Sequence, residues 1–201
     1  MDSADEGLYR KLKQAGVGMV MFGIESANQD VLDFYNKQVT VQQAREAVTL
    51  CNRMGMLSYG WFILGAPMET REHFENNLRL ANETHLDLAY YNVLGYREGS
   101  KLWEDARRQG LIKEHETTVR ANERLSNFTF EELSAIRAEL IRRIYLNPAR
   151  LLRIVYKLWR LNELSHLLQL LRKNIVAVFT DPYQKSAPAR IAVGENVPRG
   201  E

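Results

Sequence analysis

The sequence has a single cysteine, Cys51, among its 201 residues. One thiol cannot form a disulfide within the chain, and it cannot supply a metal site that needs several cysteines. The four histidines, His73, His85, His115 and His166, are scattered and lack the spacing typical of metal ligands. We therefore expect this chain to hold no metal ion by itself.

Long hydrophobic runs are missing as well. No apolar stretch approaches the ~20 residues that a membrane-spanning helix needs. The acidic N-terminus, residues 1–6, has neither the basic start nor the apolar run of a signal peptide. The glycines form no phosphate-binding loop of the G-x-x-x-x-G-K-[ST] type. These absences predict a cytoplasmic protein.

Charge is unevenly distributed, although the net charge at pH 7 is only +2. Residues 1–117 carry 13 Lys and Arg against 17 Asp and Glu, whereas residues 118–201 carry 14 against 8. The chain therefore has two compositional parts. We predict an α/β part over residues 1–117, a basic helical extension over 118–180, and a proline-containing, disordered tail over 181–201.

One pattern occurs three times in the first hundred residues: an apolar strand runs into a glycine, and a glutamate follows with a serine or threonine one or two residues after it. The runs are 20–26 (VMFGIES), 62–70 (FILGAPMET) and 93–100 (VLGYREGS). Helix-patterned sequence separates them, which is typical of successive β/α units. Parallel α/β folds build their sites at the carboxyl ends of the strands, where these polar residues would gather.

Apolar periodicity and capping residues predict the individual elements. Strands are expected at residues 19–22, 59–64 and about 88–94, and helices at residues 8–15, 40–54, 70–81, 130–146, 149–161 and 163–173. Thr40 and Gln43 are predicted to form a capping box. The continuous apolar character of residues 59–64 predicts that helices cover both faces of that strand. Three parallel strands are too few for a closed barrel, so we expect the rear portion of a larger fold.

The ordered set of these runs resembles the radical S-adenosylmethionine superfamily. The likeness is carried by residues 23–26 (GIES), by Thr40 at the start of a helix, by residues 62–70, by residues 95–102 with Trp103, and by the run from Phe130 to Pro148. The likeness covers roughly residues 8–175 and is nearest to the subgroup whose members often carry a cobalamin-binding domain. It implies an α/β fold, the C-terminal half of a partial (β/α)6 TIM-like barrel with three parallel βα units, followed by an all-α extension.

The resemblance also implies a partial S-adenosylmethionine site. Glu25 and Ser26 would face the ribose or methionyl part, because a carboxylate accepts hydrogen bonds from vicinal ribose hydroxyls. The alternative is that both residues only cap the following segment. Gly65, Ala66 and Pro67 would pass close to the adenine, which backbone groups would contact. The alternative there is a tight strand-to-helix turn, which by itself favours glycine and proline.

Other residues beside these runs are expected to have structural roles. Glu69 and Thr70 are interpreted as helix caps rather than ligands. Either Tyr91 or Asn92 could point into the barrel, and we favour a core position for the tyrosine. Residues 96–100 stand where relatives commonly place a Pro-Gly-Thr turn.

The chain departs from the family at the residues that hold its cofactor. Members bind a [4Fe–4S] cluster through a CxxxCxxC motif, which this sequence does not contain. Cys51 cannot substitute, because it lies on an apolar helix face and is expected to be a packed core thiol. Without the cluster no electron reaches the sulfonium, so we expect the isolated chain to be inert and assign no catalytic residue.

Two hypotheses of function follow. In the first, the chain is the C-terminal part of a cobalamin-type radical S-adenosylmethionine enzyme, a methyltransferase or oxidoreductase of unknown substrate. The [4Fe–4S] cluster and cobalamin would then be present only in a complete protein, with the cluster-bearing half supplied in cis or in trans. In the second, the chain is a non-catalytic half-barrel and helical module that binds a partner protein or a membrane surface.

The basic helices bear on the second hypothesis. Residues 137–173 hold nine Lys or Arg and two Glu, and one helix carries an apolar stripe. The stripe consists of Leu151, Leu152, Val155, Leu158 and Trp159. Such a helix could meet anionic lipid or nucleic acid. We favour helices packed on a barrel with solvated basic faces, since surface helices are often of this kind; a membrane is the less favoured partner and nucleic acid is not expected.

Overall fold

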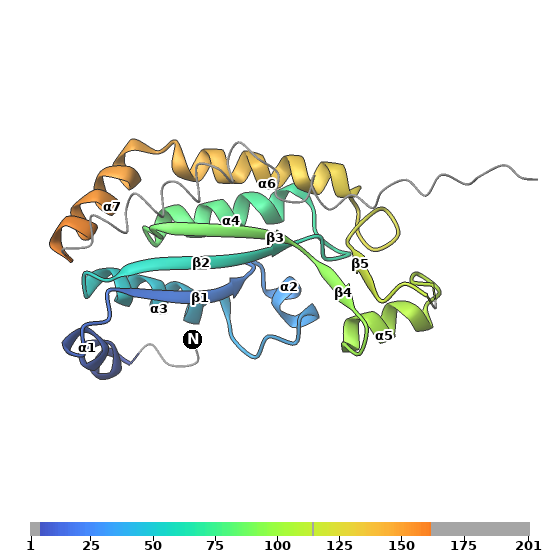
Figure 1. The fold of residues 1–201 in the computed structure, drawn as a ribbon, viewed down its shortest axis with the longest axis horizontal. Helices are drawn as coiled ribbons and strands as arrows, with labels where there is room; N and C mark the ends of the chain where they lie inside the picture. Colours follow the sequence, from blue (N-terminus) through green and yellow to red (C-terminus); the bar gives the residue numbers. More distant parts are fainter. Residues whose placement is uncertain (1–4, 114, 162–201) are drawn as a thin grey trace, which may run out of the picture.

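The computed structural model describes residues 5–113 and 115–161 (Figure 1). In chain order the elements are α1 (Glu6–Gln14), β1 (Met19–Glu25), α2 (Gln29–Phe34), α3 (Val41–Arg53), β2 (Leu57–Leu64), α4 (Arg71–Glu83), β3 (Leu88–Val93), β4 (Gly95–Arg97), α5 (Lys101–Arg108), β5 (Thr118–Arg120), α6 (Phe130–Tyr145) and α7 (Pro148–Arg160). The predicted helix over 163–173 and the predicted disordered tail over 181–201 lie outside the described residues.

The three long strands form one parallel sheet in the order β1-β2-β3. Met19 pairs with Leu57, and Tyr59 pairs with Leu88, so the strands run side by side with their carboxyl ends at one edge. All three strands are where the sequence predicted them. The short antiparallel pair β4–β5 was not predicted, because three-residue strands are too short to show a period.

The helix boundaries follow the local capping signals in the sequence. The backbone N–H of Thr40 donates to Oε1 of Gln43 at 2.7 Å, and the N–H of Gln43 donates to Oγ1 of Thr40 at 3.1 Å. This confirms the predicted capping box. Thr70 caps α4 as predicted, with its hydroxyl 2.8 Å from Nδ1 of His73.

The helices α3, α4 and α6 pack on the sheet and form the main core with one face of its strands. Figure 1 shows α4 and α6 on the β3 side and α3 on the β1 side. Phe62 and Tyr91 stack in this core with ring centroids 4.9 Å apart, which confirms the core position of the tyrosine. On the other face of the sheet, Met21 is 61% exposed and Trp61 is 44% exposed.

The prediction of helices on both faces of β2 is therefore wrong for the described residues. Trp61 and its neighbour Phe62 point to opposite faces, one open and one buried. Both are large and apolar, so the sequence shows no polar alternation that would reveal the open face.

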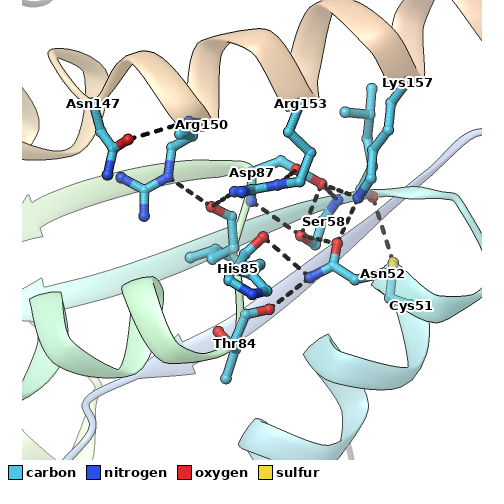
Figure 2. Close-up of polar contacts among 12 residues, drawn as sticks. Cys51, Asn52, Ser58, Thr84, His85, Asp87, Asn147, Arg150, Arg153 and Lys157 are labelled. Atoms are coloured by element: carbon cyan, nitrogen blue, oxygen red, sulfur yellow. Dashed lines mark hydrogen bonds and ion pairs between the residues drawn. The ribbon is translucent and has the colours of Figure 1, made fainter.

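The helix α7 closes the other end of the sheet, where the strands begin. Its Ile154 and Leu158 pack against Leu57 and Leu88 in a second, smaller core. Figure 2 shows the polar contacts beside this cluster, in which α7 reaches the buried carboxylate of Asp87.

The helices after residue 117 are part of the same packed molecule in the described region. The predicted helices over 130–146 and 149–161 are present as α6 and α7, and α6 packs along β3. The division at residue 117 and the half-barrel architecture remain predictions. No helix among residues 5–113 and 115–161 is both long enough and apolar enough to cross a membrane.

Candidate functional site

The end of β1 has an unusual backbone. Glu25 has φ 63, in the left-handed region that residues other than glycine rarely adopt. The pairing with β2 also shifts here, because Gly23 pairs with Trp61 and Glu25 with Phe62, which leaves Ile24 as an extra residue. Backbone strain and β-bulges both concentrate at functional sites, where they change the direction of a side chain.

This backbone turns the Glu25 carboxylate toward Gly23, two residues earlier in the chain. A Cβ atom at Gly23 would lie 2.7 Å from Oε1 of Glu25, so a larger residue there would push the carboxylate out of this position. Lys37 Nζ lies 3.0 Å from the same oxygen, and the Glu25 side chain stays 19% exposed. A partly exposed carboxylate held by one lysine can still accept hydrogen bonds from a ligand.

Ser26 is directed into the protein instead. It is buried, and its Oγ accepts hydrogen bonds from the backbone N–H and from Nδ2 of Asn28, at 3.2 and 3.0 Å. Asn77 on α4 accepts the N–H of Ala27 at 2.6 Å and completes this polar network. Ser26 thus holds the turn after β1, and its contact with a cofactor remains a prediction.

The Gly65–Ala66 turn after β2 is closed by a carboxylate. Oε2 of Glu69 accepts the backbone N–H of Gly65 at 2.5 Å and that of Ala66 at 2.8 Å. Gly65 has φ +107, and a Cβ there would lie 2.6 Å from the Cβ of Ala121. The chain's own packing therefore accounts for this glycine, which supports the tight-turn alternative. Contact of residues 65–67 with adenine remains a prediction.

The role of Glu69 was missed in the sequence. It was interpreted as a helix cap, but it reaches back to the turn that precedes α4. Glu69 is fully buried, and burial raises its pKa to about 7 although the two backbone N–H groups lower it. Its second oxygen, Oε1, has no hydrogen-bond partner among the described residues. The roles of Lys37 and Asn77 were not predicted from the sequence either, because only the tertiary fold brings these residues to the site.

A pocket of about 340 Å³ lies beside this turn. Pro67, Phe34 and Tyr96 line it together with α5 and the segment around Arg124. Its lining does not include Glu25, so the pocket and that carboxylate are separate features. We base the candidate site on Glu25, because its backbone is strained and its carboxylate stays partly exposed.

The described residues do not fit an iron–sulfur cluster. Cys51 is fully buried on α3, which confirms the core position predicted for it. Burial raises the pKa of its thiol to about 12, so the thiolate that binds metals is not formed near neutral pH. Across residues 5–113 and 115–161, no three His, Cys, Asp or Glu side chains are grouped so that they could hold a metal ion.

Comparison with known families gives a match over the first part of the chain. Residues 1–81, which contain β1, β2 and the Glu25 bulge, match the model of the Radical SAM superfamily. This stretch of the chain is similar to Radical SAM sequences. Several relatives of the chain are named as methyltransferases or as a cyclase.

Three of these relatives match different shares of the chain. The chain is 30% identical over 161 residues to an uncharacterized methyltransferase of Pyrococcus horikoshii, which covers 78% of this chain and 35% of that protein. It is 30% identical to the anaerobic magnesium-protoporphyrin IX monomethyl ester cyclase of Cereibacter sphaeroides, covering 52% of this chain and 17% of the relative. It is 24% identical to the bacteriochlorophyllide d C-8(2)-methyltransferase of Chlorobaculum tepidum. This match covers 54% of this chain and 24% of that relative.

A solved structure shows the same type of fold. The archaeal Elp3 of Methanocaldococcus infernus superposes with a TM-score of 0.54 at 16% identity, covering 68% of this chain and 30% of that one. The chain spans about a third or less of the length of each of these proteins.

Proposed function

We propose that this chain is the C-terminal part of a cobalamin-type Radical SAM enzyme, in which its three βα units form half of a partial barrel. Its contribution would be one wall of the S-adenosylmethionine site and part of the substrate cavity. The observation that carries this proposal is the Glu25 carboxylate, which a strained bulge directs to the open side at the carboxyl end of β1.

The chemistry of Glu25 suits a ribose. Its two oxygens can accept both vicinal hydroxyls, and Lys37 at 3.0 Å keeps the carboxylate oriented and partly neutralised before the ligand arrives. A preoriented acceptor binds more tightly than a mobile one, because less side-chain freedom is lost on binding.

The open face of the sheet supports the second part of the proposal. The rings of Tyr59, Trp61 and Tyr90 form a row across β2 and β3, with centroid distances of 6.1 and 5.3 Å. Such a wall suits a flat, largely apolar substrate. Two relatives are named for magnesium-protoporphyrin IX monomethyl ester and bacteriochlorophyllide d, which are substrates of this shape.

The remaining cofactors would come from outside the described residues. The cluster would supply the electron for reductive cleavage of S-adenosylmethionine, and its ligands would lie in a part of the protein provided in the same chain or by another. The chain's own residues would bind and orient the S-adenosylmethionine, and cobalamin would serve methyl transfer in the complete protein.

Binding of S-adenosylmethionine to the 201-residue chain tests the proposal. Calorimetric titration should show that Glu25→Gln weakens binding about tenfold or more, because a hydrogen bond to a charged acceptor is lost. Glu83→Gln is the matched control, since it removes a surface carboxylate paired with Arg45. Equal affinity of all three proteins, or no binding by any, would favour the non-catalytic module instead.

A further inference from the structure

The helix α7 exposes apolar side chains and directs most of its basic side chains into the protein. Its outward side chains are Leu152, Val155, Tyr156 and Trp159, which are between 44% and 72% exposed. Their spacing of three, four and seven residues places them in one row along the helix, which we call the outer stripe. Exposed apolar patches of this kind mark surfaces that bind something apolar.

The basic residues of α7 point the other way, into the protein. Lys157 Nζ lies 2.6 Å from Oδ2 of the buried Asp87, and Arg153 Nε lies 3.0 Å from its Oδ1 (Figure 2). Arg150 is buried and donates to the carbonyl of Leu86 at 2.9 Å. These ion pairs fix the rotation of the helix, so the outer stripe cannot turn inward without leaving charges unpaired. The solvated basic face expected from the sequence is therefore not what α7 presents.

The exposed charges near the outer stripe are positive. Residues 140–161 contain no Asp or Glu, and apart from the three basic side chains that point into the protein and Arg143, which pairs with Glu75, two arginines remain. Arg142 and Arg160 are exposed, and the Arg160 guanidinium lies 5.9 Å from the Tyr156 ring centroid. Tyr and Trp side chains combine an apolar ring with a polar group, which suits the boundary between lipid chains and headgroups.

We propose that the outer stripe of α7 docks on an anionic lipid membrane. The stripe is on the order of 10 Å long, so α7 would lie in the membrane surface and not cross it. The apolar side chains would enter the acyl boundary while the exposed arginines meet lipid phosphates. Among apolar partners, an anionic bilayer matches the sign of the charge that borders the stripe. This inference does not depend on the proposed enzyme function.

Vesicle co-sedimentation of the full chain tests this surface. Binding is expected to vesicles that contain phosphatidylglycerol, to be weaker with phosphatidylcholine alone, and to fall as salt is raised. Trp159→Ser should weaken binding about tenfold, because one large side chain no longer enters the apolar layer. Trp61→Ser is the matched control, since it removes an exposed tryptophan from the open sheet face and should leave binding unchanged.

Acrylamide quenching of tryptophan fluorescence provides a second test of the contact between the outer stripe and lipid. The difference between wild type and Trp159→Phe isolates Trp159, which should be quenched readily in buffer and protected by phosphatidylglycerol vesicles. Protection already in lipid-free solution would mean that the chain itself or a second copy covers the stripe, and the proposal would be wrong. Absence of vesicle binding, or a loss caused equally by Trp61→Ser, would also overturn it.

Discussion

At the residue scale, two carboxylates at the same edge of the sheet have different environments. Glu25 is partly exposed and paired with Lys37, so it stays available to a ligand. Glu69 is fully buried and binds two backbone N–H groups of the turn after β2. The first is suited to recognition, and the second holds the backbone in place.

The raised pKa of Glu69 predicts a pH-dependent stability. Its pKa is about 7 in the folded protein against an ordinary value of 4.5, so the folded state binds the proton more tightly. The contribution to stability is fully present below pH 4.5 and is lost as the pH rises through about 7. Relative to Glu69→Gln, the unfolding free energy of the wild type should fall by about 3 kcal/mol over this range.

Urea unfolding of both proteins at several pH values measures this difference. Because all other titrating groups are shared, the comparison isolates Glu69. Parallel pH profiles for wild type and Glu69→Gln would show that Glu69 ionises normally in the folded state.

At the scale of elements, charge and not apolar area sets the orientation of α7. Among the described residues, its small core contains four buried apolar side chains, two from the helix and two from the sheet. Asp87 accepts hydrogen bonds from Lys157, Arg153 and the backbone N–H of Ser58, and it is completely buried. Removing one partner of a buried ion pair leaves the others uncompensated.

Asp87→Asn should therefore destabilise the protein by about 3–5 kcal/mol. The matched control is Asp105→Asn, which removes a surface carboxylate paired with Lys101 and Arg108 and should have a much smaller effect. Chemical denaturation of the two variants provides the comparison. Similar losses in both would indicate that the Asp87 contacts add little and that packing holds α7.

At the scale of the whole molecule, the described helices α3, α4 and α6 pack on one face of the sheet. The other face carries Met21 and Trp61, both substantially exposed. The chain covers at most about a third of its relatives' length, and we propose that further βα units complete the barrel over this face.

Two neighbouring residues test this one-sided core. Phe62→Ala should lower the free energy of unfolding by about 3–5 kcal/mol, because the ring is buried and stacked on Tyr91. Trp61→Ala should cost much less in the same chain, because its ring is 44% exposed and leaves no closed cavity. Unfolding free energies of the two variants decide the point, and equal losses would mean that the open face is covered in solution.

Local signals in the sequence were enough to locate most elements. The Thr40–Gln43 capping box, the strand at 59–64 and the helices at 130–146 and 149–161 follow from short-range hydrogen bonds and apolar periodicity, which depend on near neighbours. The ligand role of Glu25 stays a prediction, which came from the resemblance and agrees with the place of this carboxylate at the end of a parallel strand.

Contacts between distant residues were decided only by the tertiary structure. The Ala121 contact that requires Gly65, the bond from Asn77 to the turn after β1, and the ion pairs that turn the basic side of α7 inward join segments far apart in the chain. The sequence by itself determined the order of strands and helices and the polar edge of the sheet. Which faces stay open, and which charges become buried, depends on packing across the whole molecule, because burial is a property of the assembled fold and not of any one segment.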